Sequence, residues 1–234
     1  MIKYHPSTDL LDAFAAGKLP TSMAIALSAH VELCQECQAY VATAEERLAS
    51  VAFAQETVGD EALMVNEWDH NAEDEMLSAI FEQAAANDTD ALTQSGAEQP
   101  EARATQITVG EKTYALPRAL QRFGDSNWAS FGKVQRARLN LDEGATRASF
   151  LHIDEGGSVP AHTHKGYELT LLLDGTFEDE SGQYVPGDFI LLDSRHHHTP
   201  YTKEGCLCYT IADAPLYFTK GVSKLLNTVG HAIY

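Results

Sequence analysis

Residues 156–175 read GGSVPAHTHKGYELTLLLDG, and their pattern is the strongest indication of how the second half of the chain folds. His162 and His164 stand two positions apart, so on a β-strand both side chains point to the same face. Glu168 follows after a short turn and can reach the same ion, and Gly175 permits the next turn. Two imidazoles and a carboxylate placed in this way predict a metal site in a β domain.

A second motif supplies one more histidine. It follows the Pro-Gly-Asp turn at 186–188 and resembles the second motif of the cupin family, which implies that the ligand, counted from that turn, is His198. Asp193 and Arg195 stand where the cupin motif usually has Pro and Gly. His196 shares strand parity with His198, so it stays open as the alternative ligand.

Together the two motifs resemble those of the cupin family. The resemblance implies an all-β jelly-roll barrel with a second divalent metal in the chain. The expected ligands are His162, His164, Glu168 and His198. Three imidazoles and one carboxylate suit zinc, manganese, iron, nickel or copper, and zinc is our first choice. The alternative is a cupin that has kept the barrel without the metal.

The residues around these motifs read as short strands. Apolar runs such as 149–153, 169–173 and 189–192 are bounded by Gly, Pro or Asp. Several short strands at such intervals are typical of an all-β sandwich or barrel. We therefore predict one β domain over residues 106–234.

The first 86 residues read as helices instead. Ser7 or Thr8 can cap a first helix that Gly17 ends, and an Ala-rich helix runs from about 35 to 55. A further helical stripe comprises Met76, Leu77, Ile80 and Phe81. Residues 87–105 are polar and contain Gly and Pro, which predicts a linker. The expected fold is α+β and multidomain, with an all-α domain at 1–86, the linker, and the β domain.

His30, Cys34 and Cys37 form a His-x3-Cys-x2-Cys motif within the helical half, and His5 is the only histidine upstream of it. Cys-x-x-Cys lets two thiolates hold one tetrahedral ion, and in a helix His30 falls on the same side. We predict a structural zinc held by all four. The alternative is a redox Cys-x-x-Cys, but that motif belongs to a strand–helix–strand context.

The negative charge of the chain is concentrated in one segment. The formal net charge is −18, and residues 32–103 hold 17 acidic residues against two basic ones. Such a surplus argues against a nucleic-acid binder, because phosphates require basic partners. No apolar run approaches the roughly 20 residues of a membrane span, and the N-terminus does not read as a signal peptide. Four cysteines are too few for a disulfide scaffold, so we expect a reducing, cytoplasmic setting.

The zinc motif in a small helical domain resembles the zinc-binding anti-sigma domain of bacterial anti-sigma factors. Joined to a cupin, it resembles the ChrR-type anti-sigma factors, which are cytoplasmic regulators of extracytoplasmic-function (ECF) sigma factors of RNA polymerase. The resemblance implies that the helical domain binds the sigma factor. It also implies that the cupin is needed for release by singlet oxygen or related oxidants, and that the protein is not an enzyme and has no catalytic residues. An acidic partner suits the basic surfaces of a sigma factor.

Two further alternatives stay open. The first is a cupin enzyme of the dioxygenase or isomerase type, with a zinc domain appended. The second concerns Cys206 and Cys208, which either pack as small apolar side chains or form a redox-sensitive dithiol. We favour packing, because a disulfide across positions i and i+2 of a regular strand would be strained.

Overall fold

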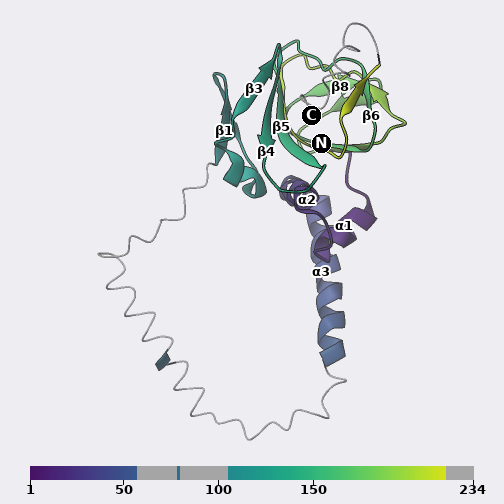
Figure 1. Ribbon diagram of the computed structural model, residues 1–234. Coiled ribbons are helices and arrows are strands. Elements are labelled where there is room, and N and C mark those ends of the chain that lie inside the picture. The colour runs from purple at the N-terminus through teal and green to yellow at the C-terminus, as the bar shows by residue number, and fades with distance from the viewer. Residues whose placement is uncertain (57–77, 80–104, 220–234) are drawn as a thin grey trace, which may run out of the picture. The chain divides into compact units, whose positions relative to one another are not determined.

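The structure is a computed structural model that describes residues 1–56, 78–79 and 105–219 (Figure 1). Residues 1–48 pack with residues 103–234 as one compact unit, and residues 49–102 form the other unit. The helical stripe predicted at 76–81 lies outside the described residues except for 78 and 79, as does nearly all of the predicted linker at 87–105.

The N-terminal segment folds into α1 (Thr8–Ala15), α2 (Thr21–Leu33) and α3 (Gln35–Glu56). The Ser7 hydroxyl accepts a hydrogen bond from the Leu10 N–H, so of the two candidates Ser7 and Thr8 it is Ser7 that caps α1. Gly17, with a φ of 65°, follows the end of this helix. Cys34 adopts an extended conformation between α2 and α3, so the chain turns sharply at the first cysteine of the zinc motif.

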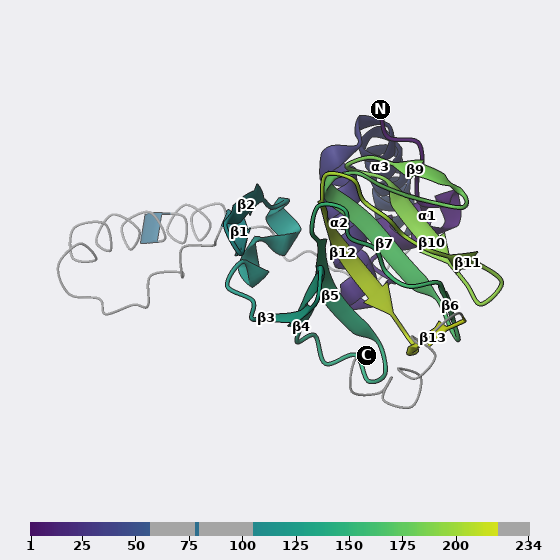
Figure 2. The same cartoon turned by 90° about the horizontal axis from the view of Figure 1, so that it is seen from above.

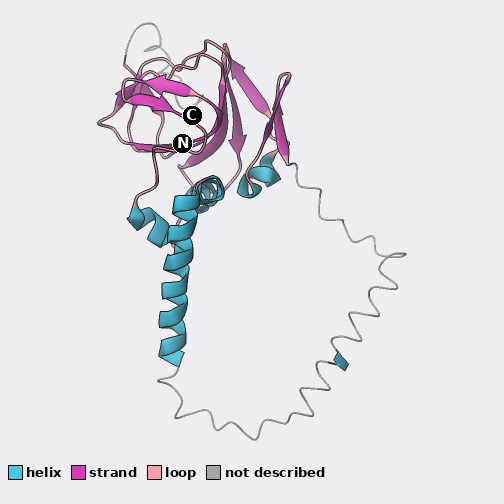
Figure 3. Ribbon diagram, turned by 180° about the vertical axis from the view of Figure 1, so that it is seen from behind, coloured by secondary structure: helices cyan, strands magenta, loops and turns pink. Residues whose placement is uncertain are grey.

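The second half forms antiparallel strands, shown in magenta in Figure 3. Their bounds are β1 (Gln106–Val109), β2 (Lys112–Ala115), β3 (Trp128–Phe131), β4 (Val134–Leu139), β5 (Arg147–Ile153), β6 (His162–His164), β7 (Glu168–Gly175), β8 (Phe177–Asp179), β9 (Gly182–Tyr184), β10 (Phe189–Leu192), β11 (His197–His198), β12 (Cys206–Ala212) and β13 (Leu216–Phe218), with a 3-10 helix at Arg118–Phe123. The three apolar runs singled out in the sequence become β5, β7 and β10.

The strands form two main sheets that enclose a barrel (Figure 2). One sheet has the order β10-β7-β12-β5-β4-β3, and the other has the order β11-β6-β13. β1 with β2 and β8 with β9 make two small hairpins. Gly175 ends β7 with a φ of 76°, and a Cβ there would collide with the backbone of Gly205, so this position requires glycine.

The six-stranded sheet is apolar on both faces, because it separates two hydrophobic cores. Its outer face carries Phe150, Leu171 and Tyr209, which join the buried residues of α2, among them Leu27, in one cluster. Its inner face carries residues of a second cluster inside the barrel, among them Leu172. Alternate residues of a strand point to opposite faces, so one sheet supports both cores.

Over residues 1–56, 78–79 and 105–219, no helix combines the length and the apolar character that a bilayer crossing needs.

Two candidate metal centres

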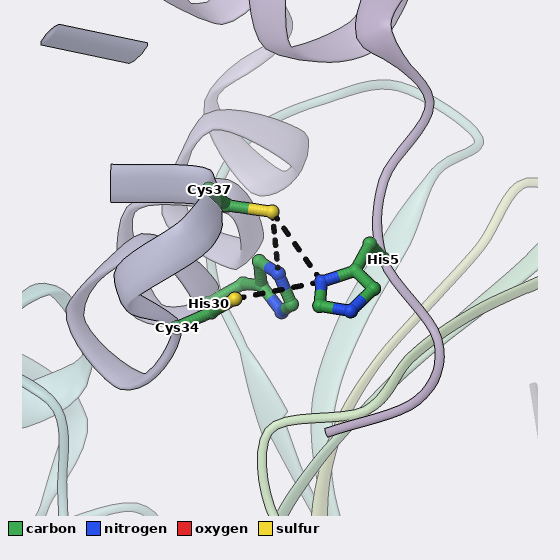
Figure 4. Close-up of side chains that lie close together, drawn as sticks. All are labelled: His5, His30, Cys34 and Cys37. Carbon is green, nitrogen blue, oxygen red and sulfur yellow. Dashed lines mark hydrogen bonds between the residues drawn. The ribbon is translucent and has the colours of Figure 1, made fainter. Parts of the chain in front are cut away.

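The first centre joins the N-terminal arm, which comprises residues 1–7, to the junction between α2 and α3 (Figure 4). His30 lies near the end of α2, Cys34 links the two helices, and Cys37 lies in the first turn of α3. His5 comes from the extended arm before α1. One ligand atom from each of the four residues lies within 4.8 Å of the others. The structure thus brings together all four residues of the predicted zinc site.

The distances within this centre match a tetrahedral zinc. His5 Nδ1 lies 3.4 Å from Cys34 Sγ and 3.5 Å from Cys37 Sγ, and His30 Nε2 lies 3.3 Å from Cys37 Sγ. Zinc bonds of about 2.3 Å to sulfur and 2.0–2.1 Å to nitrogen place two ligands of a tetrahedron roughly 3.5 Å apart. The donor set therefore fits zinc in both chemistry and spacing.

A backbone carbonyl of the barrel orients one of these ligands. His30 Nδ1–H donates a 2.8 Å hydrogen bond to the Gly187 carbonyl oxygen, which leaves the lone pair on Nε2, the atom that faces Cys37. His30 is fully buried, and burial lowers the pKa of its imidazole. Burial, and then the neighbouring Cys34, raise the pKa of the Cys37 thiol to about 12. Binding a cation here would therefore release a proton from Cys37.

The arm that carries His5 is held by the same turn of the barrel. The buried Asp188 carboxylate accepts hydrogen bonds from the Lys3 N–H at 2.6 Å, the Tyr4 N–H at 3.1 Å and the Val185 N–H at 2.8 Å. The Phe189 N–H, at the start of β10, donates to the Tyr4 carbonyl oxygen at 2.9 Å. The position of His5 thus depends on residues more than 180 positions away in the sequence.

The second centre lies at the inner edge of the barrel. His162 and His164 lie on β6, Glu168 begins β7 and His198 ends β11. All four are buried, and one ligand atom from each lies within 4.8 Å of the others. His198 Nε2 is 2.9 Å from His162 Nε2 and 3.2 Å from His164 Nε2, and Glu168 Oε2 is 3.4 Å from His164 Nε2.

Hydrogen bonds fix two of these rings with Nε2 facing the centre. His162 Nδ1–H donates to the Pro160 carbonyl oxygen at 2.8 Å, and His198 Nδ1–H donates to Asp179 Oδ2 at 3.1 Å. Their Nε2 lone pairs then face each other across 2.9 Å, an arrangement that needs a cation or a proton between them. Burial is the main cause that lowers the pKa of His162, and likewise of His164, to about 4. A proton is therefore disfavoured at neutral pH, and the site fits a divalent metal.

The neighbouring histidines fall outside this centre. His196 and His197 are exposed, and His196 Nδ1 contacts Asp193 at 2.8 Å instead. Of the two candidates that the sequence left open, the structure therefore places His198 in the cluster. Cys206 and Cys208 are free thiols with 1% and 2% exposure, buried among the apolar residues inside the barrel.

Several supporting residues were not predicted from the sequence. The Pro-Gly-Asp turn at 186–188 was recognised only as a turn, although it orients His30 and holds the arm. Asp179 orients His198 but has no motif around it. A buried pair, in which Tyr114 Oη lies 2.8 Å from His152 Nε2, also had no sequence signal, because its members come from strands that are distant in sequence.

A small helical segment with a His2Cys2 cluster, packed on a jelly-roll barrel with a His3Glu cluster, defines a two-part protein of the cupin class. The sequence model of the ChrR cupin-like domain matches residues 117–214. The anti-sigma-E factor ChrR of Cereibacter sphaeroides is 31% identical over 228 residues, which cover 97% of each chain. The chain belongs to the ChrR family of anti-sigma factors.

A solved structure shows the same architecture. The crystal structure of Rhodobacter sphaeroides SigE in complex with the anti-sigma ChrR contains a chain that matches with a TM-score of 0.58 and 26% identity. The match covers 91% of this chain and 99% of that chain. Helices followed by a cupin barrel, as predicted from the sequence, are therefore the fold of this protein.

Proposed function

We propose that this protein is an anti-sigma factor that binds an ECF sigma factor of RNA polymerase and keeps it from the polymerase. Membership of the ChrR family is the observation that carries the proposal, because the relative is similar along 97% of the chain. The acidic segment at 32–103 supports it, since a negative surface can cover the basic surfaces of a sigma factor. The protein acts by sequestration in the cytoplasm, without catalysis and without direct contact to nucleic acid.

Within this proposal, residues 1–86 form the sigma-binding domain, residues 87–105 a linker and residues 106–234 the cupin domain. His5, His30, Cys34 and Cys37 hold a structural zinc, whose role is to fix the arm, α2 and α3 in one arrangement. The tetrahedral spacing of the four donors supports this assignment.

The cupin supplies the switch. His162, His164, Glu168 and His198 hold a second divalent metal, with zinc as the first candidate. Singlet oxygen or a related oxidant changes the cupin and lowers the affinity of the helical domain for the sigma factor. A signal can shift such an equilibrium only through its different free energies in the bound and released states. The direct packing of the helices on the barrel supports a route between the two.

Inhibition is tested by transcription in vitro with purified polymerase and the ECF sigma factor encoded in the same genome. Adding the wild-type protein should abolish sigma-dependent transcripts at equimolar concentration. Cys37→Ser should lose this inhibition, and Cys206→Ser serves as the matched control because it leaves the zinc cluster intact. Full transcription in the presence of the wild-type protein would overturn the proposal.

Sensing is tested separately with a sigma-dependent reporter in cells exposed to singlet oxygen. His162→Ala should keep the reporter silent in the dark and prevent its induction in the light. A variant that still induces like the wild type would contradict the role of the second metal, while leaving the anti-sigma activity untouched.

A further inference from the structure

The first turn of α2 has no capping group of its own. Pro20 stands at the N-cap position without a side-chain hydrogen bond, and the first turn contains no acidic residue. The first N–H groups of a helix have no partner within the helix, so an acceptor near them is stabilising, and a carboxylate more so because of the helix dipole. In α2 this acceptor comes from the barrel.

The acceptor is Glu143, in the loop at 140–146 between β4 and β5. Its carboxylate accepts the Ser22 N–H at 2.8 Å and the Ser22 hydroxyl at 2.5 Å. The Ser22 carbonyl oxygen in turn accepts the Tyr209 hydroxyl of β12 at 3.1 Å. Ser22 is buried, so a lost partner would leave polar groups unpaired away from water, which is costly. The barrel thus binds the N–H, the hydroxyl and the carbonyl of one residue of α2.

The backbone of this loop is constrained next to Glu143. Asp142 has a φ of 49°, and over the residues that the structure describes it is the only residue other than glycine with a positive φ. Aspartate adopts this left-handed region at a lower cost than most residues, but the region is still unfavourable for it. Such a conformation persists where neighbouring contacts fix it. The hold of Glu143 on Ser22 is one contact that does so.

The other end of α2 is also tied to the barrel half of the chain. Glu32, in the last turn, accepts the Arg118 N–H at 2.8 Å, at the start of the 3-10 helix that follows β2. Between the two ends, Leu27 is fully buried in the cluster that α2 shares with the six-stranded sheet. His30 lies near the end of this helix, so the position of α2 on the barrel also sets the position of a zinc ligand.

The same loop adjoins the second metal centre through the sheet. It ends at Arg147, which pairs with Ala212 of β12, and Ala212 pairs with Glu168 of β7. Glu168 belongs to the second centre and, together with His162 and His198, lines a cavity inside the barrel, here called the barrel cavity. One strand therefore separates the end of the loop from a ligand of the second centre, while Glu143 of the same loop binds α2.

We propose that Glu143 is the positioning residue that connects the second centre to the sigma-binding helices. It holds α2 on the barrel in the arrangement that binds the sigma factor, and its release from Ser22 is the step that lowers the affinity when the second centre changes. This inference rests on the proposed function and adds to it the contact through which the signal passes. Affinity falls on release because only the molecules with α2 in place are competent to bind.

The first test measures the affinity of the metal-loaded, full-length protein for the sigma factor. Glu143→Ala should weaken it roughly tenfold or more, the usual cost of losing a hydrogen bond to a charged group. Glu143→Gln keeps an acceptor for the Ser22 N–H and a donor for the Ser22 hydroxyl, so it should bind more tightly than Glu143→Ala. Glu155→Ala is the matched control, because it removes an exposed carboxylate from the loop after β5, and it should bind like the wild type.

Two measurements separate positioning from a general loss of stability. Hydrogen exchange in Glu143→Ala should become faster in the first turn of α2 and stay unchanged in β5 and β12, which also shows that the barrel is folded. Ser22→Ala removes one of the two hydrogen bonds from the other side. It should weaken sigma binding on its own and add little to Glu143→Ala, because both changes break the same contact.

The second test places Glu143 in the order of the signal, with the sigma-dependent reporter in cells. Glu143→Ala should raise the reporter in the dark, and it should do so equally in combination with His162→Ala, because the contact acts after the second centre. The inference is wrong if Glu143→Ala binds the sigma factor like the wild type, or if the double variant stays as silent as His162→Ala alone. A wild-type protein that did not bind the sigma factor would overturn the proposed function instead.

Discussion

The two metal centres have the same number of donors but are built in opposite ways. The first takes three of its four ligands from eight consecutive residues, yet its orientation depends on the barrel through Gly187 and Asp188. The second collects its ligands from three strands, and the groups that orient it, Asp179 and the Pro160 carbonyl, belong to the same barrel. The first centre therefore has the ligands that lie closer together in sequence, yet it depends more on a distant part of the fold than the second centre does.

The turn at 186–188 couples the first metal centre to the barrel. Any movement of the turn at 186–188 displaces the Gly187 carbonyl that His30 contacts and the Asp188 carboxylate that holds the arm. The same turn leads into β10, whose Ile190 lines the barrel cavity. The first centre is thus exposed to changes in the barrel, whereas no contact described for residues 1–56 orients a ligand of the second.

The largest expected effect comes from removing one ligand at each centre. Cys37→Ser should lose one metal equivalent and unfold the helical segment, since a structural zinc contributes on the order of 10 kcal/mol to small zinc domains. His198→Ala should lose the other equivalent and leave the first centre occupied. Metal content by mass spectrometry, with circular dichroism for the helices, checks both. If His198→Ala emptied both centres, their separation would be refuted.

A smaller effect should follow from changing the supporting carboxylates. Asp188→Asn leaves the arm without its charged acceptor and should cost about 2–3 kcal/mol of folding free energy. It should also weaken metal at the first centre roughly 10–100-fold, the usual range for supporting residues.

Asp179→Asn is the matched control for this change. It should weaken metal at the second centre only, because Asp179 orients His198. Chelator competition on each variant measures both affinities. Equal losses at both centres in either variant would contradict the proposed difference in support.

The smallest effect concerns His152, a buried histidine outside both centres. Burial, opposed by Asp154, lowers the pKa of this imidazole below its usual 6.5. The unfolded chain therefore binds a proton below pH 6.5 that the folded protein resists. The contribution of His152 to stability is complete above that pH and falls on acidification, by at most about 1.4 kcal/mol per pH unit.

Urea denaturation at pH 7.5 and pH 5.5 measures how much the free energy of unfolding changes with pH through His152. The wild type should lose more stability between the two conditions than His152→Gln does, whereas exposed His197→Gln should behave like the wild type. An equal loss in His152→Gln would assign the acid sensitivity to the metal centres instead.

Local signals in the sequence were enough to predict much of this molecule. The cap at Ser7, the runs that form β5, β7 and β10, and the spacing of both clusters depend on neighbouring residues. The roles of Asp179 and Asp188 depend on pairings across the fold, which no local pattern encodes. The packing of α2 on the barrel was not predicted either, since a largely apolar helix indicates that it is buried but not which element covers it.

Strand β12 contacts both the barrel cavity and the helical segment. Cys208 faces the barrel interior, while the next residue, Tyr209, faces the helices and donates from its hydroxyl to the Ser22 carbonyl oxygen at 3.1 Å. The residue of β12 that lines the barrel cavity and the residue that contacts α2 are therefore neighbours in the sequence. Because successive side chains of a strand point to opposite faces, β12 contacts the barrel cavity through Cys208 and α2 through Tyr209.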